Sequence, residues 1–218
     1  MVALFNHFSY SNVIQLSENG GMNRSFQVSL VAISAMALWT PQLAQAHFKF
    51  LEPPSTWSTE NGGKGDSPCG QGTPSGIVTK AQGGHAFTIR LQEFVIHPGH
   101  YRIALSTKSR SELPKDPDAM TTPENQSISA PIDPNPKIPV LADGVFQHTT
   151  APRPTEWKTE VTLPNINCEK CTLQVTQFMA QHGFNKGGGF FYHHCADLQI
   201  TMDPSLPAAA KAWTDLSK

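Results

Sequence analysis

Histidines are the side chains of this sequence best placed to do chemistry, and one has an unusual position. The segment LAQAHFKF places His47 directly after Ala44-Gln45-Ala46, a small-x-small tripeptide of the kind behind which signal peptidases cut. Cleavage after Ala46 would make His47 the first residue of the mature chain. A terminal histidine carries a free amine and an imidazole on one residue, so it forms a bidentate metal ligand.

Other histidines cluster around turns and strand starts. The segment IHPGHYRIAL places His97 and His100 on either side of a Pro-Gly turn, and GGFFYHHCADLQI places Tyr192 beside His193 and His194. An isolated histidine is usually a surface or core residue without a metal. The clustering makes these positions candidate ligands.

Three nitrogen donors would form a T-shaped set: the amine and imidazole of His47 and one further imidazole. Such a set suits copper, which heads the divalent affinity order and accepts tetragonal nitrogen ligands. The free pKa of an α-amine is about 7.7–8, so a metal can displace its proton near neutral pH. We therefore expect one copper ion.

The N-terminal segment has the pattern of a targeting sequence. A charged start at Met22-Asn23-Arg24 precedes the apolar run FQVSLVAISAMALW, which is shorter than the about 20 residues that span a bilayer. We expect residues 1–46 to be a signal peptide with its true start at Met22, and an uncleaved membrane anchor is the alternative. Residues 47–218 then form a single copper-binding domain, secreted to the extracellular space or the periplasm, monomeric and free of the membrane.

Composition predicts an all-β fold. The chain has 16 basic and 17 acidic residues with no basic block, which argues against nucleic-acid binding. Its 18 prolines and 16 glycines separate short apolar runs. We expect an immunoglobulin/fibronectin-like antiparallel β-sandwich with long loops, the proline-rich region 107–156 among them. The expected strands are 47–51, 85–91, 100–106, 157–164, 171–179 and 196–202, and the C-terminal tail is a short helix or a frayed end.

The segment 171–179 shows the alternation of a half-buried strand. Leu173, Val175 and Gln177 share one face. The other face carries Thr172, Gln174, Thr176 and Phe178. The polar Gln177 and the apolar Phe178 are the two departures from a clean pattern.

Cysteine usage fits an oxidising compartment. The four cysteines are Cys69, Cys168, Cys171 and Cys195. An even count behind a signal peptide predicts two disulfides, with three possible pairings. Zinc bound by thiolates is the competing interpretation of CEKC, although the chain has no second CxxC.

Four sequence islands together resemble the lytic polysaccharide monooxygenases, copper proteins with a histidine brace. They are HFKFLEPP at the predicted mature terminus, GDSPCG, HPGHYRIAL and GGFFYHHCADLQI, in that order. The resemblance implies that His47 and His97 hold the copper and that Tyr192 is its axial neighbour. It also implies that Cys69 pairs with Cys195, which leaves Cys168 to pair with Cys171.

Several roles stay open within this resemblance. His100 competes with His97 as the brace imidazole. His193 or His194 would position an oxygen species beside the copper, with Tyr192 and His193 as the expected catalytic residues. Gln174 and Gln177 are further candidates for that position, and Asp197 is a candidate extra ligand.

The resemblance implies oxidative cleavage of a polysaccharide such as chitin or cellulose, with O2 or H2O2 and an external electron donor. Trp57 and Trp157 are candidates for an aromatic surface that binds it. The alternative is a histidine-brace protein that captures or delivers copper without catalysis. A plain secreted binding module is the third hypothesis, and it predicts that His47, His97 and Tyr192 lie far apart.

Overall fold

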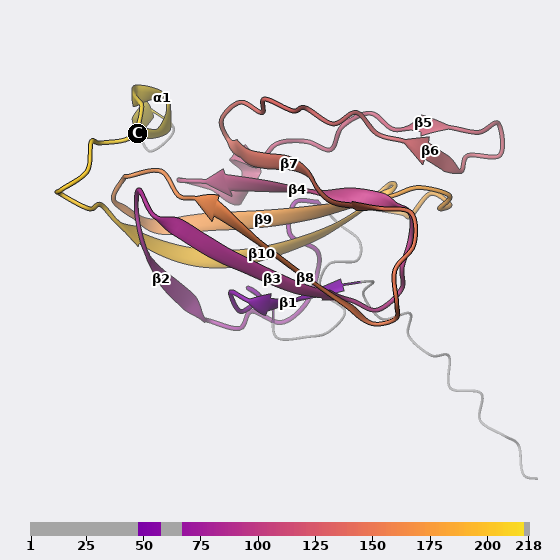
Figure 1. Ribbon diagram of the computed structural model, residues 1–218, viewed down its shortest axis with the longest axis horizontal. Helices are drawn as coiled ribbons and strands as arrows, with labels where there is room; N and C mark the ends of the chain where they lie inside the picture. Colours follow the sequence, from indigo (N-terminus) through magenta and orange to yellow (C-terminus); the bar gives the residue numbers. More distant parts are fainter. Residues whose placement is uncertain (1–47, 58–66, 216–218) are drawn as a thin grey trace, which may run out of the picture. The chain divides into compact units, whose positions relative to one another are not determined.

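Two sheets packed face to face form a β-sandwich in the computed structural model (Figure 1), which confirms the expected all-β fold. The structure describes residues 48–57 and 67–215, all within the compact unit Pro41–Lys218. His47 and the expected signal peptide lie outside the described residues. No helix within the described ranges is long and apolar enough to cross a bilayer.

The smaller sheet has the strand order β1-β3-β8 and the larger has the order β2-β10-β9-β4-β7. Their bounds are β1 Phe48–Glu52, β2 Val78–Gln82, β3 Ala86–Glu93, β4 Gly99–Ser106, β7 Val140–His148, β8 Thr155–Thr162, β9 Cys168–Met179 and β10 Phe191–Thr201. A two-stranded hairpin, β5 Met120–Thr121 and β6 Ser127–Ser129, a 3-10 turn η1 Arg110–Glu112 and the helix α1 Lys211–Asp215 complete the elements. All paired strands are antiparallel except β2 and β10, which run parallel.

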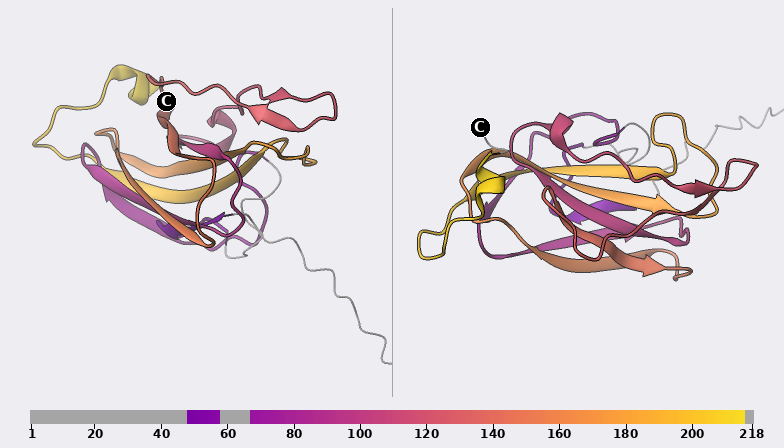
Figure 2. Two further views of the ribbon diagram at one scale, coloured as in Figure 1. Left: turned by 45° about the vertical axis from the view of Figure 1, so that its right-hand side comes forward. Right: turned by 90° about the horizontal axis from the view of Figure 1, so that it is seen from above.

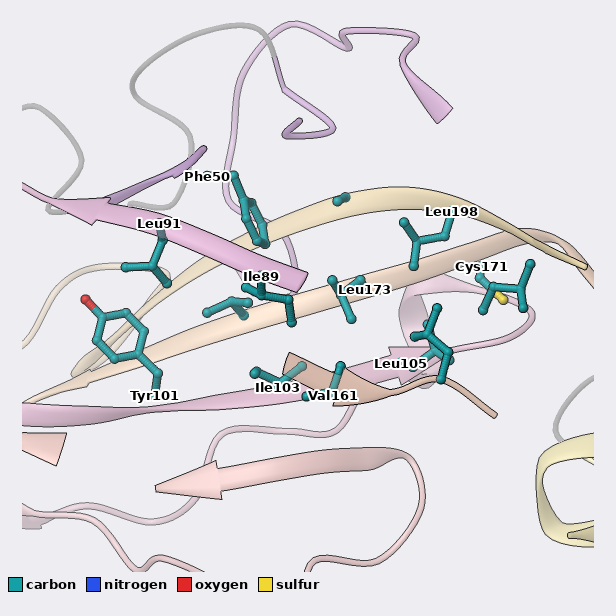
Figure 3. Packing of buried hydrophobic residues seen from close by; sticks show 14 of the residues in the cluster. Phe50, Ile89, Leu91, Tyr101, Ile103, Leu105, Val161, Cys171, Leu173 and Leu198 are labelled. Carbon is teal, nitrogen blue, oxygen red and sulfur yellow. The ribbon is translucent and has the colours of Figure 1, made fainter. Parts of the chain in front are cut away.

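Inward-facing apolar side chains from both sheets fill the space between them. Figure 3 shows this cluster with Tyr101 at one end and Cys171 near the other. The predicted alternation of β9 is confirmed, because Leu173 and Val175 point into this core and Phe178 packs on the opposite face with Phe191. The expectation of a half-buried strand is wrong, because residues 171–179 are buried on both faces. Burial of these side chains is the main stabilising contribution to the sandwich.

The outer face of the larger sheet is covered by the segment 107–139, which includes the β5–β6 hairpin (Figures 1 and 2). Leu113 packs there against Ala104, and Ala119 packs against Phe178. The region 107–156 is therefore not all loop as expected, because it also contributes the edge strand β7. Asp143 and Gly144 in the middle of β7 are turn-forming residues, and Gly144 has a φ of 68°, so the sequence gives no clear strand signal there.

Candidate functional site

Three aromatic rings from separate segments meet at one end of the sandwich. His97 lies in the turn between β3 and β4, His182 in the loop after β9, and Tyr192 near the start of β10. The rings of His97 and His182 contact edge to face at 4.9 Å, and those of His182 and Tyr192 do so at 6.0 Å. The structure thus brings two of the predicted site residues, His97 and Tyr192, to a common third residue, His182. We call these three residues the ring cluster.

The turn that carries His97 is fixed by a close approach to β9. A Cβ atom on Gly99 would lie 2.0 Å from the carbonyl oxygen of Phe178, so only glycine fits at this position. The amide of Ala180 donates to the carbonyl oxygen of Pro98 at 2.7 Å. The Pro-Gly pair therefore locks the His97 turn against the end of β9.

The loop that carries His182 is also held by backbone hydrogen bonds. Asn185 and Gly189 exchange two N–H···O bonds of 2.8 and 2.9 Å, and the amide of Gln181 donates to Ser127. Gly189 has a φ of 58°, a conformation for which glycine is suited. Phe184 on this loop is 60% exposed, and its ring packs edge-on against Phe190.

Burial keeps the candidate ligands of this cluster neutral. It lowers the pKa of His97, with His182 as the second cause, so the imidazole is unprotonated near neutral pH. Tyr192 is fully buried, and this raises the pKa of its hydroxyl to about 12, against a hydrogen bond with Asn185 that lowers it. A neutral imidazole is the form that binds a metal.

The first described residue, Phe48, is held at the start of β1 by His194 of β10. His194 Nε2 donates to the Phe48 carbonyl oxygen at 2.9 Å, and the two rings contact at 4.6 Å. Phe48 pairs with Glu93 in the register of β1 and β3. The strand that follows His47 in the sequence therefore starts at the end of the sandwich that carries the His97 turn.

A buried carboxylate, that of Glu93, lies between the two sheets close to the His97 turn in the sequence. Glu93, four residues before His97, is fully buried, and its oxygens accept hydrogen bonds from Gln177 at 2.7 Å and Trp157 at 2.9 Å. His148 Nε2 lies 3.4 Å from the same carboxylate without the geometry of a hydrogen bond, and its interaction with Glu93 is the main cause of the raised pKa of His148. We name these residues the Glu93 cluster: Glu93, His148, Trp157 and Gln177.

Other expected site residues point elsewhere. His193 follows Tyr192 on β10 and so faces the outer side of the sheet, where its Nε2 lies 2.8 Å from Asp116 Oδ1. The structure does not bring His193 to the ring cluster, so the expected catalytic role is not retained for it. Asp197 pairs with Arg110 at 3.0 Å, five residues along β10 from Tyr192, and cannot serve as an extra ligand at the cluster.

The remaining candidates are also accounted for by other contacts. His100 faces outward on β4 and packs on Phe178, while Gln174 donates to the carbonyl of Pro68. Gln177 donates to Glu93. Trp57 donates to the carbonyl of Cys69 and Trp157 belongs to the Glu93 cluster, and both side chains are half-buried.

Both expected disulfides are present. Cys69 pairs with Cys195, and Cys168 pairs with Cys171. The first joins the segment after β1 to the outer face of β10, and the amide of Thr56 donates to the carbonyl of Cys195 nearby. No free cysteine remains in the described part of the chain.

Sequence reasoning missed His182, Glu93 and His148. His182 sits in a glycine-rich loop with no spacing that relates it to His97. Glu93 and His148 end two different strands and meet only because those strands lie in facing sheets. Within 48–57 and 67–215, no three His, Cys, Asp or Glu side chains converge as a complete metal site.

Comparisons with known proteins give a distant likeness of fold. No family model and no curated protein matches the sequence. Among solved structures, the chain is similar to "Lytic Polysaccharide Monooxygenase AA15 from Thermobia domestica in the Cu(I) State", with a TM-score of 0.36 and 14% identity over 67% of this chain and 71% of that one. Because similarity at this level establishes neither family nor activity, function has to be inferred from the residues.

Proposed function

We propose that the mature chain begins at His47 and holds one copper ion between the amine and imidazole of His47 and the imidazole of His97. In this proposal the protein is a secreted copper monooxygenase that oxidises a polysaccharide such as chitin or cellulose. The supporting observation is the contact of His97 and Tyr192 with His182 at the end of the sandwich where β1 starts.

The donor set fits copper better than the other common metals. The proposed ligands are nitrogens, and the neutral Tyr192 phenol beside them is a weak neighbour rather than a charged ligand. When bound, copper supplies the one-electron chemistry that reacts with O2 or H2O2 at the expense of an external electron donor.

The described residues have defined tasks in this proposal. The His97 turn is held by Gly99, and His194 holds the carbonyl of Phe48 at the start of β1, so the described backbone that adjoins each proposed ligand is fixed. His182 contacts both His97 and Tyr192, which suits it to orient their rings beside the site. The exposed ring of Phe184 on the same loop offers an apolar face to a sugar ring.

A copper carrier without catalysis is the second candidate. The observation that favours it is the complete burial of Tyr192, which closes one side of the proposed site. A closed site would bind copper without admitting O2 or H2O2. Activity on chitin and cellulose with a reductant separates the two candidates.

Copper titration tests the site itself. Calorimetry and electron paramagnetic resonance would be recorded on the protein starting at His47 and on the same protein with one added N-terminal alanine. We expect 1:1 binding with a three-nitrogen spectrum that is lost on extension and in His97→Ala. His100→Ala is the matched control, because His100 lies three residues away and faces outward. Equal, weak binding by all four proteins would refute the copper site.

A further inference from the structure

A cavity of about 670 Å³ lies on the outer face of the larger sheet, away from the ring cluster. It is lined by Arg102 of β4 and by Val140 and Asp143 of β7. Its other walls come from the covering segment and are dominated by prolines: Pro114, Pro117, Pro131, Pro134, Pro136 and Pro139. The volume is in the range of small-molecule sites.

Arg102 is a buried cation with few partners. Its side chain is 9% exposed, yet Nε has no hydrogen-bond partner. Nη2 reaches the carbonyl oxygen of Pro114 only at 3.5 Å and Asp116 Oδ1 only at 3.8 Å. The same oxygen of Asp116 lies 2.8 Å from His193 Nε2, so Asp116 is held closer to His193 than to Arg102.

Such a guanidinium is unfavourable unless something completes its hydrogen bonds. Burial lowers the pKa of Arg102, which reflects the cost of desolvating its charge. A guanidinium matches a carboxylate through two parallel N–H···O bonds. A ligand with a carboxylate would therefore supply what Asp116 does not.

The rest of the cavity restricts the ligand further. Asp133 and Asp143 line it, and both oxygens of Asp143 accept backbone amides, from Asp133 at 3.0 Å and Gly144 at 2.8 Å. The negative charges of Asp133 and Asp143 repel a dianion more strongly than a monoanion, and Lys137 offsets one of them, so a ligand with a single carboxylate fits best. Proline rings give the walls flat apolar faces, which suit an apolar ring.

We propose that this cavity binds a small monocarboxylate with an apolar ring, and that Arg102 holds the carboxylate. The proposal is independent of copper and of the ring cluster. A structural role is the competing explanation, in which Arg102 only tethers the covering segment through Pro114. The two explanations differ in whether a ligand reaches the guanidinium.

Benzoate is the probe, tested on the full mature chain by calorimetry beside benzyl alcohol, its uncharged analogue, and phthalate, a dianion. We expect benzoate to bind and both analogues to bind at least about tenfold more weakly. Arg102→Met should weaken benzoate binding by at least about tenfold. Lys115→Met is the matched control and should leave binding unchanged, because Lys115 is exposed and does not line the cavity.

A second measurement does not depend on the fold of any variant. The ¹H–¹⁵Nε resonance of Arg102 in the unaltered protein should move on titration with benzoate and stay in place with benzyl alcohol. Benzoate that binds more weakly than about 10 mM, or that leaves this resonance unmoved, would overturn the proposal. Equal binding of benzyl alcohol, or binding of phthalate as tight as that of benzoate, would do the same.

Discussion

Two buried charged side chains, Glu93 and Arg102, lie on opposite sides of the larger sheet, and they differ in how closely polar partners surround them. Glu93 is enclosed between the sheets, and the indole, amide and imidazole of the Glu93 cluster all reach its carboxylate within 3.4 Å. Arg102 faces the covering segment, its nearest carboxylate oxygen is 3.8 Å away, and its Nε is unsatisfied.

This difference in partners distinguishes a charge that stabilises the fold from a charge that can bind a ligand. Removing a partner of a buried, fully bonded charge is costly, because the groups left behind remain desolvated. A buried charge that borders a cavity and has only long contacts gains little from its neighbours, while it still carries the cost of desolvation. On this basis Glu93 supports the sandwich, while Arg102 is free to serve binding.

The largest effect is expected for Glu93→Ala. It leaves the N–H groups of Trp157 and Gln177 buried without their acceptor and removes the carboxylate beside His148, so the free energy of unfolding should fall by about 3–5 kcal/mol. Urea denaturation measures the change. Glu156→Ala is the control, because its ion pair with Arg90 is exposed and should be worth less than about 1 kcal/mol. Similar losses in the two variants would contradict the structural role of Glu93.

Trp157→Phe should cost about 1.5–3 kcal/mol, since it deletes one charge-assisted hydrogen bond to Glu93. The aromatic stacking on His148 is retained by phenylalanine. Trp57→Phe is the matched control, because its indole donates to the neutral carbonyl of Cys69 and should cost about 0.5–1.5 kcal/mol. Thermal or urea unfolding of both variants would show whether the order is reversed.

Arg102→Met should change the free energy of unfolding by less than about 1 kcal/mol, because the guanidinium has no close partner to lose. The long apolar side chain of methionine fills most of the same space. If Arg102→Met lowers the free energy of unfolding as much as Glu93→Ala does in the same urea titration, the two charges do not differ and Arg102 has a structural role.

A smaller, pH-dependent effect is expected for His148→Gln. The pKa of His148 is raised in the folded protein, so its stabilising contribution is present below the unfolded value of about 6.5 and is lost as pH rises through the folded pKa. The stability difference between the two proteins should therefore be larger at about pH 5.5 than at about pH 8.5. His97 and His100, whose pKa values are lowered, act in the opposite direction, but they do so in both proteins. Parallel pH curves would contradict the His148–Glu93 interaction.

Much of the sandwich could be predicted from alternation and turn residues, and its exceptions are informative. Gln177 looked out of place on the core face of β9, and it is there because it donates to Glu93. Phe178 looked out of place on the other face, and it is buried there by the covering segment. β2 and β7 were not predicted, because β2 is a short edge strand with exposed residues and β7 contains Asp143 and Gly144.

The candidate site was predicted only in part for a related reason. Motifs within one segment pointed to His97 and Tyr192, and the structure brings both to His182. The contacts of His182, Glu93 and His148 join segments that are distant in the sequence, so no local spacing could reveal them. Strand alternation alone, however, already places His193 and Tyr192 on opposite faces of β10.

The position of β10 in the larger sheet also bears on how the chain folds. β10 lies between β2 and β9. Residues 78–82 of β2 therefore cannot form their strand pairing until residues 191–201 of β10 are present. Such non-local pairing slows folding, typically to milliseconds or seconds in all-β domains. A nascent chain that stops short of β10 would expose the edges of both neighbouring strands, and this intermediate is the one most exposed to aggregation.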